Sequence, residues 1–402
     1  MKKMNNFPTK KLGEVVSTIE SGKRPKGGAV SSGIPSIGVE HISDSNGFKL
    51  DGLKYIPGNF YESLNKGKLN RGDILIAKDG ATTGKTVFLS DDFPFSKAAI
   101  NEHIFILRGK NEMINQKFLF YILYSPQGQR QILKTKHGAA QGGIDQSFVN
   151  FVKIPLPPLE IQKQIVERMD KIAEAQKLND ELIQKADELF QSLLHKELNP
   201  AGKNWEVKKL GEVCEIARGG SPRPINNYIT NSSDGINWIK IGDAKEGEKY
   251  IVSTEQKIKL EGVSKTRLVK EGDFILSNSM SFGRPYILKI SGAIHDGWLL
   301  LRLKNTDLSP DFLYYILGSS QTQIQFEKSA SGGVVRNLNS DLVRKIKIPV
   351  PPLKVQKQIV EKLSAAQEYK KQLFAQKSKL KELFDSVLNK SMKGELIKLK
   401  KL

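Results

Sequence analysis

Two long stretches of the chain place apolar side chains at steps of three and four residues. The first runs from Glu160 to Asn199 without proline or glycine, and its apolar positions are Ile161, Ile165, Met169, Ile172, Ala175, Leu178, Leu182, Ala186, Leu189 and Leu193. The second carries Val355, Ile359, Leu363, Ala366, Leu373, Leu380, Leu383 and Val387. A single narrow stripe of this kind is typical of a coiled-coil seam. The spacing therefore predicts long helices near Glu160–Leu198 and Lys354–Asn389 that pack through these stripes, and two unrelated surface helices are the alternative.

The residues before each stripe follow a different pattern. Short apolar runs punctuated by glycine and asparagine predict strands, and they include Ile34–Val39, Ile74–Ala77 and Ile104–Leu107. Segments near Gln116–Tyr124 and Pro310–Leu317 predict short helices. Each globular part is therefore predicted to be mixed α/β. The proline-rich I-P-x-P-P-L that follows each part prevents helix until the long stripe begins.

The sequence repeats itself once. IPLPPLEIQKQIVERM (154–169) recurs as IPVPPLKVQKQIVEKL (348–363), with 11 of 16 positions identical at an offset of 194. KKLGEV (10–15) recurs at 208–213, and GDILIA (72–77) corresponds to GDFILS (272–277). Duplication of this length predicts two copies of one structural unit. The first long helix ends in HKEL (195–198) and lacks the glycine of the second copy's GEL (394–396), which leaves the equivalence of the two helix ends open.

The repeat sets the expected domain boundaries, which are a globular domain at 1–155, a helix at 156–199, a second globular domain at 200–349 and a helix at 350–402. A helix of about 40 residues is roughly 60 Å long, whereas a domain of about 150 residues is only about 40 Å across. Such a domain could not easily return the chain to begin a parallel helix, so we expect the helices to run antiparallel. The predicted fold class is α+β, in which two long antiparallel helices separate two mixed α/β domains in a pseudo-two-fold internal repeat.

Charge and composition narrow the function. The chain has 63 Lys and Arg residues against 43 Asp and Glu residues, a net charge of +20. This excess favours a polyanionic partner such as nucleic acid, although an inert basic surface would give the same count. The single cysteine, Cys214, allows no internal disulfide and favours a reducing compartment. No apolar run is long enough for a membrane span, and the first residues lack the apolar stretch of a secretory signal, so we expect a cytoplasmic protein.

Several of these motifs occur together in one known family. The repeated G-I-P-x-I or G-I-N-x-I, the G-D-x-L segment, the I-P-[LV]-P-P-L-x-x-Q-x-x-I-V start of each long helix and the GEL at 394–396 resemble the specificity subunits of type I restriction-modification systems. The resemblance covers essentially the whole chain. It implies that the globular parts are target recognition domains, which read the two halves of a bipartite double-stranded DNA sequence. It also implies that the long helices are spacers that bind methyltransferase (modification) subunits, two of them by our expectation, and that restriction (motor and nuclease) subunits join the complex.

The sequence lacks recognisable catalytic motifs. Its five histidines are scattered, it has no cysteine pair for zinc, and no G-x-G-x-x-G follows a predicted strand. We therefore expect a non-enzymatic subunit with no metal or cofactor of its own, and S-adenosylmethionine, ATP and Mg²⁺ only on partner subunits. The alternatives are a coiled-coil scaffold that binds other proteins and a single-chain enzyme with an unrecognised nuclease site.

One glycine-rich segment has two interpretations. Gly80–Thr86 resembles a phosphate-binding loop, but only three residues separate its glycines, and the apolar run after it predicts a strand rather than a helix. The two copies share a glycine followed by a base here, Gly84-Lys85 and Gly283-Arg284. A loop that presents a cation to DNA and a plain hairpin turn both remain open.

Candidate DNA-binding residues are the basic and amide side chains of glycine-rich loops. Lys and Arg contact DNA phosphates, and Arg, Lys, Asn and Gln read the edges of nucleobases. In the first domain these are Lys23, Arg24, Lys26, Lys78, Lys85, Lys136, His137 and Gln141, and in the second domain Arg218, Arg223, Asn278, Arg284, Arg336 and Asn337. The polar positions that the two long helices share are the candidate partner-binding residues, namely Gln162, Lys163, Gln164, Gln356, Lys357 and Gln358.

Overall fold

The computed structural model describes residues 7–43, 47–138, 142–245, 247–278, 282–304, 307–329 and 338–395. These residues fall into two compact units. Unit 1 comprises Met1–Glu181 and Ala375–Leu402, and unit 2 comprises Leu182–Phe374. Each unit therefore contains one globular domain and a segment of each long helix.

The described residues of unit 1 form three small sheets. Its strands are β1 (Thr9–Lys11), β2 (Val16–Ser21), β3 (Ile34–Ile37), β4 (Lys54–Ile56), β5 (Ile74–Ala77), β6 (Thr86–Phe88), β7 (Ala99–Ile100), β8 (Ile104–Gly109) and β9 (Lys153–Pro155). Its short helices are α1 (Leu12–Val15), α2 (Gly58–Ser63), α3 (Gln116–Tyr124) and α4 (Pro126–Leu133), with 3-10 turns η1 (Val39–His41), η2 (Gly80–Thr82) and η3 (Gln146–Asn150). The sheet orders are β2-β8-β5-β6, β4-β3-β7 and β1-β9.

Unit 2 repeats this plan. Its strands are β10 (Glu206–Lys209), β11 (Cys214–Arg218), β12 (Ile229–Thr230), β13 (Ile236–Ile239), β14 (Tyr250–Ile251), β15 (Gln256–Ile258), β16 (Arg267–Val269), β17 (Phe274–Ser277), β18 (Pro285–Leu288), β19 (Gly292–Ile294), β20 (Trp298–Leu303) and β21 (Lys347–Val350). Its short helices are α6 (Leu210–Val213), α7 (Pro310–Gly318), α8 (Ser320–Ser329) and α9 (Ser340–Lys345), with 3-10 turns η4 (Ile225–Asn227), η5 (Ile241–Asp243) and η6 (Leu260–Lys265). The sheet orders are β11-β20-β17-β18-β14, β12-β15-β13-β19-β16 and β10-β21.

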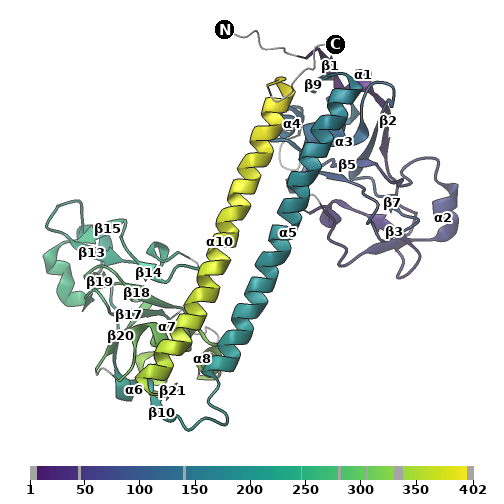
Figure 1. The fold of residues 1–402 in the computed structure, drawn as a ribbon. Coiled ribbons are helices and arrows are strands. Elements are labelled where there is room, and N and C mark those ends of the chain that lie inside the picture. Colours follow the sequence, from purple (N-terminus) through teal and green to yellow (C-terminus); the bar gives the residue numbers. More distant parts are fainter. Residues whose placement is uncertain are drawn as a thin grey trace. The chain divides into compact units, whose positions relative to one another are not determined.

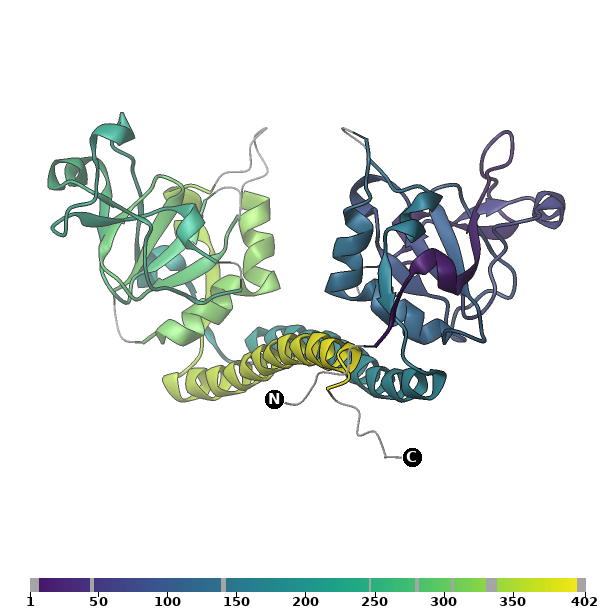
Figure 2. The ribbon, with the colours of Figure 1, turned by 90° about the horizontal axis from the view of Figure 1, so that it is seen from above.

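The two sheet topologies confirm the internal repeat. The run β2-β8-β5-β6 of unit 1 corresponds to β11-β20-β17-β18 of unit 2, and in both runs all neighbours are antiparallel. Unit 2 adds the parallel edge strand β14. The predicted short helices are present as α3 and α7 (Figure 1). Within each unit, the sheets lie on one side of the helix segments (Figure 2).

The long helices are α5 (Leu159–Leu198) and α10 (Leu353–Met392), each of 40 residues. Both their starts and their ends are related by the offset of 194, so the two helix ends are equivalent despite the missing glycine. In unit 1, Gln176 Nε2 donates to the Leu380 carbonyl at 3.3 Å, and Asp180 pairs with Lys377 at 2.8 Å. The residue numbers thus rise along one helix as they fall along the other.

In unit 2 the same relation holds. Asp187 pairs with Lys370, and Glu197 pairs with Lys362 at 2.9 Å. The helix segments are therefore antiparallel within each unit, as the sequence predicts. The helices also carry the globular domains, because Lys117 of α3 pairs with Asp170 of α5 at 2.9 Å and Tyr315 of α7 bonds Gln367 of α10 at 3.0 Å.

Only part of the predicted apolar stripe is buried. Ile165, Met169 and Ile172 join the core of unit 1 together with Phe384 and Leu388 of α10. The core of unit 2 contains, from the long helices, Leu194, Leu198, Ile359 and Leu363.

The expectation that every stripe residue lies in the helix seam is wrong for Leu178, Leu182, Leu189 and Leu383, which are all exposed. An α-helix has 3.6 residues per turn, so a stripe repeating every 3.5 residues drifts by about 20° per heptad in a straight helix. The buried face of each helix also turns toward α3 or α7, which takes it further from the expected seam.

The repeated G-D motif has a structural cause. Asp73, at the start of β5, accepts from Arg108 Nε at 2.6 Å and from Arg108 Nη2 at 2.8 Å. Asp273 holds Arg302 in the same way, at 2.8 and 2.6 Å. Both carboxylates are buried, and their hydrogen bonds raise the pKa of each arginine further above its ordinary value. The motif therefore ties two central strands of each domain together.

Candidate DNA interface

In unit 1 the loop after β2 lies against the connection that leads into β8. In unit 2 the loop after β11 lies against the connection that leads into β20. At Gly22, a Cβ atom would stand 1.9 Å from the Ile100 carbonyl oxygen, and at Gly219 it would stand 2.2 Å from that of His295. Only glycine fits at such distances. The two glycines therefore bring the basic loop residues that follow them close to the β7–β8 and β19–β20 connections.

In unit 1 the candidate residues lie in three loops, namely the loop after β2, the β5–β6 hairpin and the loop before η3, and a carboxylate links the first two. Glu102, in the β7–β8 connection, has its Oε1 3.0 Å from Arg24 Nε and 3.3 Å from His103 Nε2. On the other side of the imidazole, His103 Nδ1 lies 3.0 Å from both carboxylate oxygens of Asp79, in the β5–β6 hairpin. The loop after β2 is thus joined to the hairpin through Glu102 and His103.

The third loop of unit 1 is attached to the same hairpin. The Ile144 amide donates to the Lys78 carbonyl at 2.8 Å, and Thr83 Oγ1 donates to the Gly142 carbonyl at 3.3 Å. Lys136 and His137 are exposed in this loop. Lys78 is half-buried, with its ammonium 5.6 Å from the centre of the Phe105 ring.

Unit 2 builds the same arrangement around Asp296. Its carboxylate accepts from Ser221 Oγ at 2.9 Å, lies 2.9 Å from His295 Nε2 and pairs with Arg223 Nη2 at 3.7 Å. Its backbone carbonyl accepts from Arg218 Nε at 3.3 Å and from Asn278 Nδ2 at 2.8 Å.

In unit 2, residues 330–337 of the third loop lie outside the described residues, and the residue that follows them is bonded like its counterpart in unit 1. The Leu338 amide donates to the Asn278 carbonyl at 3.0 Å, where Ile144 donates to Lys78 in unit 1. The described parts of the candidate loops therefore lie close together within each unit.

The His295 ring is held in one orientation. The Gly297 amide donates to His295 Nδ1 at 3.0 Å, so the proton of the neutral ring is on Nε2, which lies 2.9 Å from Asp296 Oδ1. Burial lowers the pKa of His295, and this effect outweighs the attraction of Asp296. The ring is therefore neutral at neutral pH.

The structure places most of the predicted DNA-binding residues at the surface of these loops. The exposed ones are Lys23, Arg24, Lys26, Lys136, His137, Arg218, Arg223 and Arg284, while Lys78 and Lys85 are half-buried. Gln141, Arg336 and Asn337 lie outside the described residues. The prediction for Asn278 is wrong, because its side chain is buried and its amide donates to the Asp296 carbonyl. The segment Gly80–Thr86 begins with a 3-10 turn and leads into strand β6, as the apolar run after it predicts.

Sequence reasoning missed the carboxylates at the centre of each loop cluster. Glu102 and Asp296 are related by the same offset of 194 as the helix motifs, and each lies just before an apolar strand. Extending the repeat alignment through this connection would have paired them. Their neighbours His103 and His295 are not at equivalent positions, so histidines alone gave no repeated signal.

The spacer residues divide into two groups. Gln162 and Gln356 are fully buried, which corrects the prediction that they bind a partner. Gln162 Nε2 donates to the Met113 and Pro157 carbonyls at 3.0 and 2.8 Å, and its Oε1 accepts from the Asn115 amide at 2.7 Å. Gln356 makes the same three bonds in unit 2.

These two glutamines repeat because they fix each long helix to its domain. The other predicted partner-binding residues lie closer to the surface. Lys163, Lys357 and Gln358 are exposed, and Gln164 is half-buried.

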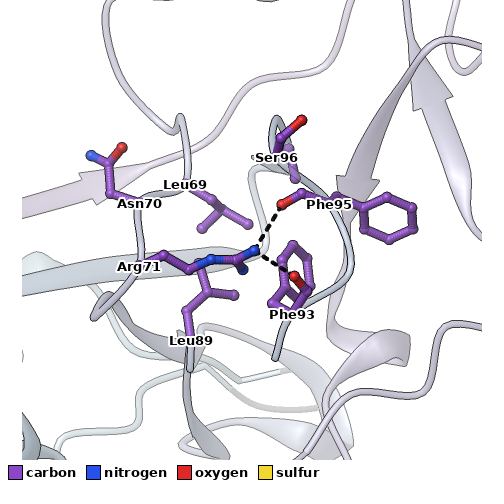
Figure 3. Close-up of a pocket in the computed structure, with 8 residues that line it drawn as sticks. Leu69, Asn70, Arg71, Leu89, Phe93, Phe95 and Ser96 are labelled. Atoms are coloured by element: carbon purple, nitrogen blue, oxygen red, sulfur yellow. Dashed lines mark hydrogen bonds between the residues drawn. The ribbon is translucent and has the colours of Figure 1, made fainter. Parts of the chain in front are cut away.

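One small pocket lies in unit 1 away from these loops. It has a volume of about 190 Å³ and is lined by Leu69, Asn70, Arg71, Leu89, Phe93, Phe95, Ser96 and Ala98. Figure 3 shows the Arg71 guanidinium pointing to the carbonyls of Phe93 and Phe95, to which it donates at 2.5 and 3.4 Å. The Arg71 guanidinium is therefore hydrogen-bonded to backbone carbonyls of the pocket wall.

Among the described residues, no three His, Cys, Asp or Glu side chains gather in a way that could hold a metal ion. No helix in the described ranges combines the length and apolar character needed to cross a membrane.

The comparison with protein families decides the identity of this fold. The family described as type I restriction modification DNA specificity domain matches residues 4–188 and 202–393, one match for each copy of the repeat. The chain belongs to this family. As a specificity subunit it recognises the DNA target, and the sequence resemblance is confirmed over the scaffold alternative.

Relatives and solved structures agree with this assignment. The type I restriction enzyme MjaVIII specificity subunit of Methanocaldococcus jannaschii is 24% identical over 388 residues, which cover 90% of this chain and 86% of that protein. A chain from a structure on complex assembly and conformational transition of the type I R-M system has a TM-score of 0.66 at 21% identity, covering 98% of this chain and 99% of that one. The type I S subunit from M. genitalium has a TM-score of 0.58 at 16% identity, covering 97% and 98%. These structures share the fold.

Proposed function

We propose that each unit of this specificity subunit reads one half of a bipartite double-stranded DNA target through the loops that carry its exposed basic residues, next to Glu102 in unit 1 and Asp296 in unit 2. The observation that carries the proposal is the repeated loop cluster, in which exposed basic side chains lie near Glu102 in unit 1 and near Asp296 in unit 2. Arginine and lysine at such positions neutralise phosphates and read guanine edges. The net charge of +20 supports this partner.

The long helices bind the methyltransferase subunits, two by our proposal, and restriction subunits complete the assembly. Their exposed polar residues Lys163, Lys357 and Gln358 support this role. Leu189 and Leu383 add to it, because they occupy equivalent positions and are 52% and 47% exposed. Exposed apolar side chains repeated on two helices fit a repeated protein partner better than solvent.

The chain has no catalytic site of its own in this proposal, and it acts in the cytoplasm. S-adenosylmethionine, ATP and Mg²⁺ belong to the partner subunits. The support is membership of a family defined by DNA specificity, together with a sequence in which no methyltransferase or nuclease motif is recognisable. Incubation of the chain alone with duplex DNA and Mg²⁺ should give no cleavage, and cleavage would favour the single-chain nuclease.

The salt dependence of DNA binding tests the loop assignment. The full chain with its methyltransferase subunits is titrated with duplex DNA at several salt concentrations. Each phosphate contact contributes about 0.9 to the slope of log affinity against log salt. Replacing Lys23 and Lys26 by alanine should therefore lower the slope by up to about 1.8.

Lys110→Ala is the matched control for this titration. Lys110 follows β8 at the end opposite to Glu102, where its ammonium donates to the Glu14 carbonyl at 2.9 Å. Its replacement should leave the slope unchanged. Equal slopes for all variants would contradict the assignment of the loop after β2.

A further inference from the structure

We propose that Glu102 and Asp296 are positioning residues for target selectivity, which fix the basic and polar side chains of each loop cluster in the geometry that reads DNA. This inference rests on the proposed function of the loops. The juxtaposition that carries it occurs twice, at positions related by the repeat offset of 194, and both times the carboxylate contacts residues from other candidate loops.

A carboxylate inside a DNA-binding surface requires a reason, because it repels phosphate. It weakens binding to any DNA backbone, whatever the sequence. Here each carboxylate lies next to positive or polar groups of the protein. Glu102 Oε1 pairs with Arg24 at 3.0 Å and lies 3.3 Å from His103 Nε2, while the Asp296 carboxylate accepts a hydrogen bond from Ser221 and pairs with Arg223 at 3.7 Å.

The benefit lies in the order that these bonds impose. A free arginine samples many rotamers, whereas base reading needs its planar fork in one orientation. An ion pair with a fixed carboxylate restricts the orientations of such a fork before DNA arrives, so that less freedom is lost on binding. The carboxylates should therefore raise specific affinity and lower non-specific affinity, and both effects increase the selectivity ratio.

The two units differ in what the carboxylate holds. In unit 1 it fixes one arginine and one histidine, whose ring is also held by Asp79. In unit 2 the carboxylate and the carbonyl of Asp296 together hold Ser221, Arg218 and Arg223. The carboxylate is present in both domains, but the side chains that it contacts differ. Two domains of the same fold can therefore read different DNA sequences. The carboxylate in each unit should accordingly influence one half of the target only.

The test measures selectivity in the full chain bound to its methyltransferase subunits. The methylated target is first mapped by sequencing, and affinities are then measured for a duplex with that target and for a scrambled duplex. Glu102→Gln keeps the shape and removes the charge. We expect specific affinity to fall by about tenfold, with non-specific affinity unchanged or higher. Glu102→Gln combined with Arg24→Ala should lose little more than Arg24→Ala alone, because Glu102 acts through the arginine that it positions.

Two controls separate positioning from a general structural effect. Glu62→Gln removes a carboxylate of the same unit that pairs with Lys97 at 2.9 Å at the surface, and it should leave the ratio unchanged. Loss of folded protein lowers both affinities equally, so it does not change the ratio either. Asp296→Asn should reduce discrimination in the other half of the target and leave the half affected by Glu102→Gln intact.

The outcomes distinguish this inference from the proposed function. If Glu102→Gln and Asp296→Asn leave the selectivity ratio at the wild-type value while Arg24→Ala weakens binding, the loops bind DNA but the carboxylates do not position them. If replacing Lys23, Arg24 and Lys26 together leaves both affinities unchanged, the proposed DNA interface itself is wrong. A reduced ratio in one half of the target supports the positioning role.

Discussion

Replacing Gln356 by alanine should destabilise unit 2 rather than weaken partner binding. The Gln356 side chain is 0% exposed and makes three hydrogen bonds, each of 2.8 Å, to the Ser309 amide and to the Asp307 and Pro351 carbonyls. Alanine leaves all three backbone groups without this partner. A buried polar group left unsatisfied costs about 1–3 kcal/mol, and taking the low end for three groups gives about 3 kcal/mol.

Thermal unfolding of the full chain measures this cost. For 150–250 residues, each kcal/mol corresponds to about 2–4 °C in Tm, so we expect a fall of about 6–12 °C. Gln358→Ala, two positions along the same helix and exposed, should change stability by less than about 0.5 kcal/mol. A Tm within about 1 °C of the wild type, combined with loss of the methyltransferase subunits, would refute the reasoning and restore Gln356 to the partner surface.

Two further predictions concern the helix seam and pH. Leu373 is only 4% exposed, so Leu373→Asp should lower the free energy of unfolding, measured with denaturant, by about 3 kcal/mol or more. Leu182 is 41% exposed, so Leu182→Asp should lower it by less than about 1 kcal/mol. Equal losses would contradict the observed seam. Burial lowers the pKa of His295, so the unfolded chain binds its proton first as the pH falls through about 6.5, and stability that is complete above that pH should be lost below it. Measured between pH 8 and 5, the Tm of His295→Gln should fall less than that of the wild type, and parallel curves would contradict a neutral buried imidazole.

Local patterns predicted much of the fold because they repeat and because they depend on neighbouring residues. The α5 helix from Leu159 to Leu198 follows directly from a proline-rich start and a 3/4 apolar spacing. Its antiparallel pairing with α10 followed from chain length alone. The individual seam residues did not, because helix periodicity cannot show where α3 and α7 compete with the opposite helix for the same face. Leu182 and Leu189 were misplaced for this reason.

The candidate site was only partly predictable, for a related physical reason. Basic residues such as Arg24 and Arg223 can be recognised in the sequence because they lie in glycine-rich loops. Asn278 has the same composition signal, but its side chain is consumed inside the protein by Asp296. The repeated Gln162 and Gln356 were equally misleading, because backbone groups 47 or 49 residues away along the chain accept or donate their bonds. Such long-range partners leave no local pattern in the sequence.

The most direct test of the account maps the methylated DNA sequence of the complete methyltransferase complex for the wild type and for variants of the loops in one unit. The account predicts a bipartite methylated target. Substituting Arg24 and Lys26 of unit 1 should relax or change one half of that target and leave the other half and the gap intact, while Arg218 and Arg223 of unit 2 should do the reverse. A target that changes in both halves with either pair of substitutions, or in neither half with both pairs, would contradict the account.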